Sequence, residues 1–297
     1  MIYAIFLSGF ALTATLSLVK KPRSFAVSNE IFFYALLLSA SLVFGFRQDV
    51  GFDYATYVEL YRLTPPVGPG FLDAARRLHG ELGYEILVGA LKTIGISRAT
   101  FLLLAITIVT PLIHLKVFRT YTNYYLISFF VFFGLYYFGR EIGQIRQAIA
   151  TAAAVLAWPQ LLSEEEYAER RYWLLTFLAA TFHLSALVQL PFYRWFRREH
   201  SMSTLGLLVG GALLVGGLPW LQQLSGALSA IDPRFLTHVA AGPETGIPLF
   251  SIKIARRVAP AVITGLLVIY LERGRDQDGR RELSILLNIS VLAACGV

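Results

Sequence analysis

The chain has 297 residues, of which 56% are hydrophobic and 15% are charged, and its mean hydropathy is +0.60. This composition excludes a disordered chain and a disulfide-rich scaffold, and it predicts an integral membrane protein. The net charge of +7 does not indicate nucleic acid, because most arginines and lysines flank apolar runs, where they set topology and meet lipid or substrate phosphates. Cys295 is the only cysteine, which excludes an intrachain disulfide and a cysteine-rich metal site. We also expect no bound metal and no cofactor.

Apolar runs of about 20 residues, the length that a spanning helix needs, recur along the chain. They predict an all-α bundle of about eight or nine transmembrane helices plus one interfacial or re-entrant helix. The second run follows Ser28, Asn29 and Glu30, which are typical of a helix start. The runs are Ile2–Val19, Ile31–Phe46, Thr100–Phe118, Tyr124–Phe138, Ala148–Leu162, Trp173–Tyr193, Thr204–Leu221, Val258–Leu271 and Leu283 onward.

The segment Tyr84–Ile96 decides the topology of everything that follows it. It is only about 13 residues long, a length better suited to an interfacial or re-entrant helix than to a span. If it does not span, residues 139–147 lie on the same outer face as Arg47, and if it spans, they lie on the opposite face. Charge counting slightly favours the spanning alternative. We adopt the other topology, because the segment is short and because it brings the arginines together.

We interpret residues 1–297 as a single membrane domain with an extracytoplasmic loop at 47–81 and a second loop at 223–256. The first loop is polar and contains several prolines, which exclude one long helix. The last apolar run stops at Val297 without a polar flank, which predicts that one or more further helices are missing from this sequence.

The densest polar motif follows the second apolar run, and its members are Arg47, Asp49, Gly51, Asp53, Tyr54 and Tyr57. The arginine offers a planar fork for two phosphate oxygens, and the glycine lets backbone approach a ligand closely. Either aspartate could accept a proton from a hydroxyl, and the tyrosines suit stacking on sugar or prenyl chains. The simpler alternative is that the charges anchor the helix at the headgroups and that the tyrosines belong to an aromatic belt.

A second motif places Arg140, Arg146 and Gln147 at the start of an alanine-rich helix. Free N–H groups and partial positive charge at a helix start, together with two guanidiniums, suit a phosphate or pyrophosphate. Simple anchoring by arginines that reach the membrane surface is the alternative.

His183 lies about ten residues, or about 15 Å, from either end of its apolar run, which predicts a position near the membrane midplane. An ionisable group at that depth is a functional candidate, with Ser185 or a carboxylate as its partner. The alternative is a neutral histidine bonded to a backbone carbonyl.

Four short motifs, in this order along the chain, resemble the EpsG-like exopolysaccharide polymerases, a branch of the Wzy-type membrane glycosyltransferases. They are Phe46–Tyr54 with Tyr57, Glu81-Leu-Gly-Tyr84, Arg146-Gln-Ala-Ile-Ala150, and Phe182-His-Leu-Ser-Ala186 followed by Leu190-Pro191.

The resemblance implies a polymerase of GT-C type in a bacterial inner membrane, which joins oligosaccharide units linked to polyprenyl pyrophosphate on the extracytoplasmic side. Such an enzyme makes an exopolysaccharide or capsule, works with other polysaccharide assembly proteins, and is expected to need no metal. The resemblance implies catalytic roles for Asp49, Asp53 and His183. It implies substrate contacts at Arg47, Gly51, Tyr54, Tyr57, Glu81, Arg140, Arg146 and Gln147.

Two other classes of protein remain as alternatives. A flippase for lipid-linked oligosaccharides would use the same arginines for the pyrophosphate, but the paired halves with matching broken helices that such a transporter would show are not visible. The second alternative is another membrane transferase, for acyl groups or single sugars. The Walker loop, the dinucleotide glycine motif, HExxH and GxSxG are absent from the sequence.

Overall fold

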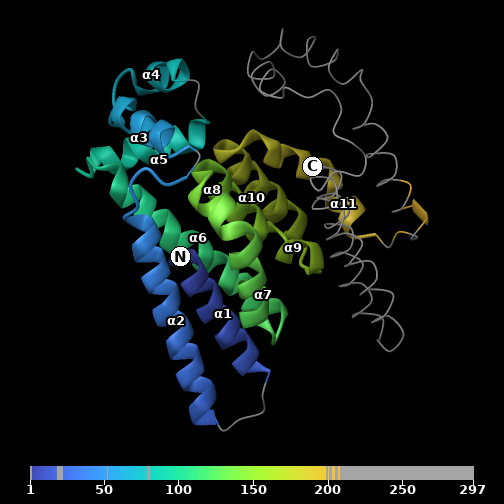
Figure 1. Ribbon diagram of the computed structural model, residues 1–297. Helices are drawn as coiled ribbons and strands as arrows, with labels where there is room; N and C mark the ends of the chain where they lie inside the picture. The colour runs from blue at the N-terminus through green and yellow to red at the C-terminus, as the bar shows by residue number, and fades with distance from the viewer. Residues whose placement is uncertain are drawn as a thin grey trace. The chain divides into compact units, whose positions relative to one another are not determined.

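The computed structural model describes residues 2–18, 23–51, 53–78 and 81–198, together with positions 200, 203, 204 and 207. Every regular element in this part of the chain is helical, which confirms the all-α class there (Figure 1). The chain divides into two compact units, residues 1–190 and 191–297. The groups discussed below lie in the first unit, and the interpretation of the whole chain as one membrane domain stays a prediction.

The first two helices, α1 (Ile2–Ser17) and α2 (Arg23–Gly45), pack against each other. The prediction that the second helix starts near residues 28–30 is wrong, because these residues lie inside α2. One of their side chains bonds across the helix pair, where Asn29 Nδ2 donates to Thr13 O at 3.0 Å. A hydrogen bond between two helices thus takes the place of the expected helix cap.

The later elements are mostly short helices. They are α3 (Tyr54–Leu63), α4 (Phe71–Arg77), α5 (Leu82–Thr93), α6 (Ala99–Tyr121), α7 (Tyr125–Phe132), the π-helix η1 (Phe133–Ile142), α8 (Ile145–Ala157), α9 (Pro159–Leu162), α10 (Ala168–Phe182), the 3₁₀ helix η2 (Leu184–Phe192) and α11 (Tyr193–Phe196).

Two of the described helices are long and apolar enough to cross a membrane, the 22-residue segment Ser24–Gly45 of α2 and the 23-residue α6. Helix α1 is apolar but has only 16 residues, and α5 has 12, in agreement with the short segment predicted there. The last three predicted runs and the loop at 223–256 lie outside the described residues, apart from isolated positions. The predicted number of spans therefore stays a prediction.

The apolar run that contains His183 does not form one helix. Helix α10 ends at Phe182, and His183 is extended, with φ −157° and ψ 113°. The prediction that His183 lies in the middle of a helix is therefore wrong. The chain continues as the 3₁₀ helix that contains Pro191, which has no N–H for an α-helical bond.

The polar segment 47–81 contains two helices, α3 and α4, joined by a turn. Pro65 follows directly on Thr64, which caps the end of α3, and Gly70 has φ +78° immediately before α4. Figure 1 shows α3, α4 and α5 gathered at one end of the α2 and α6 pair. The side of the membrane on which this end lies stays a prediction.

Aromatic side chains fill the contact between α1, α2, α7 and η1. The fully buried ring of Phe10 lies 5.4 Å from that of Phe33, 5.2 Å from Phe129 and 4.5 Å from Phe133, measured between ring centroids. Tilted and edge-on contacts of this kind add to the free energy that burial of the rings contributes. The N-terminal helix is thereby held to the middle of the bundle.

A proline in α6 explains the polar contact between the two long helices. Pro111 has no N–H for the carbonyl of Thr107, four residues before it, which therefore lacks its helical donor. Ser41 Oγ on α2 donates to that carbonyl at 2.7 Å, and Thr107 Oγ1 donates to Ser41 O at 3.0 Å. The side chain of one helix thus satisfies a backbone group that the other helix leaves open.

We expect Ser41→Ala to lower the free energy of unfolding by about 1–3 kcal/mol, because it leaves the buried Thr107 carbonyl without a donor. In a Pro111→Ala background, residue 111 regains an N–H, so the same substitution should cost clearly less. Unfolding of the four proteins in detergent measures this difference. Ser39→Ala is the control, since Ser39 Oγ is exposed and bonds only to Ala35 O of its own helix. Equal losses in both backgrounds would contradict the explanation.

Candidate functional site

Three side chains from distant parts of the sequence meet at one carboxylate. Glu81 Oε2 accepts a charged hydrogen bond from Arg146 Nη1, and Glu81 Oε1 lies 3.3 Å from Nδ1 of His183. The side chains of Glu81, Arg146 and His183 are 13%, 25% and 34% exposed. The cluster is therefore mostly shielded from water and still open at the histidine. Of the two partners considered for His183, the structure shows the carboxylate.

Each member of this cluster lies at the end of a helix. Glu81 directly precedes α5, Arg146 is in the first turn of α8, and His183 directly follows α10. The predicted helix start at Arg146 and Gln147 is confirmed, since α8 begins at Ile145. An arginine in the first turn of a helix adds its charge to that of the free N–H groups, a combination that attracts anions.

Close packing of α5 and α8 against α10 brings the three ends together. A Cβ atom on Gly83 would lie 2.3 Å from Thr181 Oγ1 and 2.9 Å from the Thr181 carbonyl carbon, so only glycine allows α5 to approach α10 this closely. Small buried residues between α8 and α10, among them Ala150, Ala154 and Ala179, have the same effect. Glu81 and His183 owe their contact to these small residues.

Two tyrosines form the wall behind Arg146. The guanidinium carbon lies 5.8 Å from the centre of the Tyr57 ring, and the Tyr57 and Tyr84 rings lie 5.6 Å apart. Tyr57 is 3% exposed and Tyr84 is completely buried. Tyr57 is already covered by protein, so its predicted stacking on a sugar or prenyl chain would require the ring to be uncovered.

One donor of Arg146 has no partner in the described part of the chain. Its Nη1 binds Glu81, whereas its Nε is buried and has no hydrogen-bond partner among the described residues. Guanidinium groups bind phosphate oxygens through paired N–H groups, and the pairing is strongest where water is excluded. The arrangement suits an anion that contacts Arg146 beside Glu81.

Arg47 is buried and bonds to the backbone, whereas the sequence analysis predicted a substrate contact for it. It is 6% exposed, and its side chain donates to three backbone carbonyls: Nε to Val50 at 3.0 Å, Nη1 to Phe44 at 2.7 Å and Nη2 to Ile142 at 2.8 Å. Burial lowers the pKa of Arg47, and Tyr137 and Tyr54 oppose this shift. In this arrangement Arg47 ties the end of α2 to the residues that precede α8.

Gly51 contributes to the same contact. It has φ +113°, and a Cβ atom there would lie 2.8 Å from Ile142 O. The close backbone approach expected at this glycine is therefore made to Ile142. The segments of Arg47 and Arg146 meet here, four residues before Arg146, as the adopted topology requires.

The remaining predicted residues belong to the two segments that contain Arg47 and Arg146. Asp49 is exposed at a turn with φ +52°, and Asp53 directly precedes α3. Tyr54 is half-buried at the start of α3, and Gln147 is half-buried beside Arg146. Arg140 lies in η1, and its side chain is outside the described part of the structure. Their roles stay predictions.

A buried carboxyl that the sequence analysis did not select lies one turn after Glu81. Glu85 is completely buried, and its Oε2 lies 2.5 Å from Thr64 Oγ1, while its Oε1 has no hydrogen-bond partner among the described residues. The nearby Lys92 ammonium donates to the carbonyls of Thr64 and Arg62 instead. Burial raises the pKa of Glu85, and the Thr64 hydroxyl offsets part of this shift.

The hydrogen bonds of the Thr64 hydroxyl favour a protonated, neutral Glu85. Thr64 Oγ1 has one proton and lies 2.8 Å from Leu60 O as well as 2.5 Å from Glu85 Oε2. If the hydroxyl donates to Leu60, a proton on Glu85 completes the second bond. Glu85 could have been found from the sequence, because it lies four residues after Glu81 in an apolar segment and therefore on the same side of a helix.

These observations define a helical membrane protein with a polar site built at helix ends. The chain belongs to the EpsG family, which matches residues 30–296. This family is associated with exopolysaccharide polymerases of glycosyltransferase type and with lipid-linked saccharides. No curated protein and no solved structure matches the chain. Among the described residues, no group of three or more histidine, cysteine, aspartate or glutamate side chains suits a metal ion.

We expect Arg47→Met to lower the free energy of unfolding by about 1–3 kcal/mol for each carbonyl left without a donor. Arg47→Lys should restore only part of the loss, because an ammonium cannot reproduce the planar fork. Thermal unfolding in detergent measures the effect. Arg62→Met, which removes an exposed cation from α3, is the control and should leave the melting temperature almost unchanged. Wild-type stability of Arg47→Met combined with loss of activity would instead support the predicted substrate contact.

The pH dependence of stability should reveal the proton on Glu85. Because the folded pKa is raised, the folded protein keeps a proton that the unfolded chain loses above about pH 4, so stability falls as pH rises through this range up to the folded pKa. Glu85→Gln mimics the neutral carboxyl, so it should remove this part of the pH dependence and keep the fold. Unfolding of both proteins across pH measures the difference. Identical pH profiles would contradict a raised pKa.

Proposed function

We propose that this protein is a membrane glycosyltransferase that polymerises oligosaccharide units linked to polyprenyl pyrophosphate, on the extracytoplasmic side of a bacterial inner membrane that it crosses several times. The observation that carries this proposal is the meeting of Glu81, Arg146 and His183. Membership of the EpsG family supports the polymer and the lipid-linked substrate.

His183 is the proposed general base. Its Nδ1 faces the Glu81 carboxylate, which favours the tautomer with a proton on Nδ1 and a lone pair on Nε2. In the proposed step, Nε2 takes the proton of an acceptor hydroxyl while the hydroxyl oxygen forms a bond to the anomeric carbon of the growing glycan. The bond from that carbon to the lipid pyrophosphate breaks, and its electron pair leaves with the pyrophosphate.

Arg146 is the proposed contact of the departing pyrophosphate. Charge builds on the leaving oxygen during the step, and a fixed guanidinium at a helix start stabilises it. A pyrophosphate at Arg146 would compete with Glu81 for the guanidinium and leave Glu81 more strongly bonded to His183. Binding of the donor would in this way increase the basicity of the histidine.

The remaining predicted residues have supporting roles in this proposal. Asp49 and Asp53 stay candidates for holding acceptor hydroxyls or acting as a second base. Tyr54, Gln147 and Arg140 stay candidates for substrate contacts. Arg47 and Gly51 act by holding the segment before Arg146, as the hydrogen bond of Arg47 to Ile142 O and the close approach of Gly51 to the same carbonyl indicate.

We expect Glu81→Gln, Arg146→Gln and His183→Gln each to reduce polymer formation by about 10²–10⁴-fold, the range typical of a lost base or charge stabiliser. Chromosomal replacement in the producing cells, sizing of the surface polysaccharide and mass spectrometry of extracted lipids provide the measurement. Single lipid-linked units should accumulate as polymer disappears. Arg62→Gln is the matched control for Arg146→Gln. Polymer of normal length from either the Arg146 or the His183 variant, at normal protein level, would disprove the proposal.

The side on which the units accumulate distinguishes a polymerase from a flippase. Loss of a polymerase leaves single units on the outer surface, whereas loss of a flippase leaves them inside. Accessibility of the units to an added glycosidase in intact cells separates the two outcomes, and accessibility only after permeabilisation would favour the flippase.

A further inference from the structure

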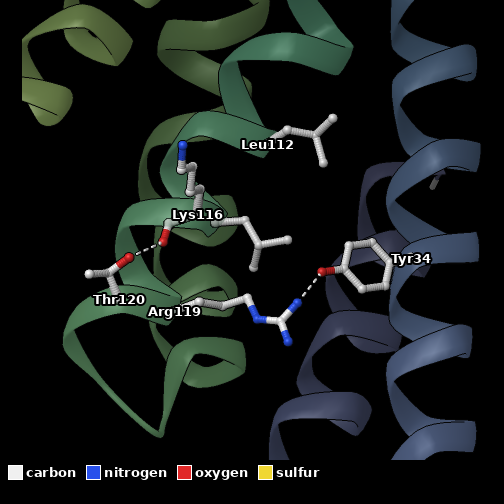
Figure 2. Close-up of a pocket in the computed structure, with 6 residues that line it drawn as sticks. Tyr34, Leu112, Lys116, Arg119 and Thr120 are labelled. Carbon is white, nitrogen blue, oxygen red and sulfur yellow. Dashed lines mark hydrogen bonds between the residues drawn. The ribbon is translucent and has the colours of Figure 1, made fainter.

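A second polar site lies between the two helices that are long enough to cross a membrane. A cleft of about 310 Å³ is lined by Tyr34 of α2 and by Leu112, Leu115, Lys116, Arg119 and Thr120 of α6. Figure 2 shows Tyr34 facing Arg119 across the gap between the helices. Two cations and two hydroxyl groups thus share one opening with two leucines.

This cleft is remote from Glu81, Arg146 and His183. Tyr34 is eleven residues before Gly45, where α2 ends near Arg47, which corresponds to about 16 Å along the helix. Lys116 and Arg119 lie in the last two turns of α6, whose first half packs near Ile145 and Ala148 of α8. The cleft and the candidate active site therefore lie toward opposite ends of the long helices.

Arg119 is held in place by its neighbours on two other helices. Its Nη1 donates to Tyr34 Oη at 2.7 Å, its Nη2 lies 3.7 Å from Glu30 Oε1, and its guanidinium carbon lies 5.0 Å from the centre of the Tyr125 ring. The side chain of Arg119 is still 46% exposed. Since the guanidinium is already fixed, an anion that binds it loses less side-chain entropy than it would at a mobile arginine.

Lys116 adds a second positive charge, and its ammonium has no partner among the described residues. Glu30 is the carboxylate nearest to Arg119, and the hydroxyl of Tyr125 donates to it. The two cations therefore outnumber the one carboxylate. On the apolar side of the cleft, Leu112 is 41% exposed and available to a hydrocarbon chain, while Leu115 is buried.

We propose that this cleft binds the phosphate of an anionic phospholipid, with the headgroup at Lys116, Arg119 and Tyr34 and an acyl chain along Leu112. Cations beside the apolar surface of a spanning helix are the chemistry that recognises such lipids. A free phosphate ion would use the cations alone and gain nothing from the leucine. The site would make lipid composition a determinant of how the α2 and α6 pair is held together.

Native mass spectrometry of the full-length protein in detergent, titrated with phosphatidylglycerol, tests the proposal by giving the apparent Kd of the tightest bound lipid. Each cation near an anionic lipid contributes roughly fivefold to binding. We expect Lys116→Gln and Arg119→Gln each to raise this Kd about fivefold, and the double variant about 25-fold. Phosphatidylcholine with the same acyl chains should bind the wild-type protein more weakly.

Arg171→Gln is the matched control, because Arg171 is an exposed cation in the first turn of α10, away from His183, and lines no part of this cleft. Lys116→Gln decides the outcome if Arg119→Gln unfolds, since the Lys116 ammonium holds no other described residue. An unchanged Kd for Lys116→Gln, an equal effect of Arg171→Gln, or equal affinity for the two lipids would overturn the proposal. Full displacement of phosphatidylglycerol by inorganic phosphate would overturn it in favour of a free-phosphate site.

Discussion

At several points in the described structure, a side chain donates to a backbone carbonyl that has lost its helical donor. The rest of the described structure depends on these bonds. Arg47 serves three carbonyls where α2 ends and η1 gives way to α8, and Ser41 serves the carbonyl that Pro111 leaves open in α6. In the 3₁₀ helix, the hydroxyl of Tyr172 donates to Gln189 O at 3.0 Å. Away from water an unpaired carbonyl costs roughly several kcal/mol, so these bonds stabilise the helices where their own hydrogen bonding is interrupted.

Helix ends are also where the residues of the candidate active site lie. Regular helices use their own backbone groups, whereas their ends present free N–H groups and polar side chains to a ligand. Glu81, Arg146 and His183 each lie within the first turn of a helix or directly beside an end. The interruption of the apolar run at His183 therefore does more than shorten a helix, because it turns the histidine toward a carboxylate 102 positions away.

The two charged sites differ in what surrounds them. At the candidate active site, the carboxylate of Glu81 holds an arginine and a histidine in a mostly shielded position, and Glu85 and two tyrosines are buried nearby. At the cleft between α2 and α6, Lys116 and Arg119 remain exposed next to an apolar surface. A shielded group of opposite charges suits proton transfer and charge stabilisation, and an exposed pair of cations suits a lipid headgroup.

The sequence by itself determined the helical class, the short segment at α5, the helix start at Arg146 and the motifs of the EpsG family, because periodicity, length and local charge are properties of neighbouring residues. It also selected Glu81, Arg146 and His183 as candidate site residues. Only the tertiary structure decided that Arg47 faces backbone carbonyls, that α10 ends before His183 and that Glu85 is buried. Each of these depends on a contact between residues far apart in the chain, which a local pattern does not contain: Arg47 with Ile142, His183 with Glu81, and Glu85 with Thr64.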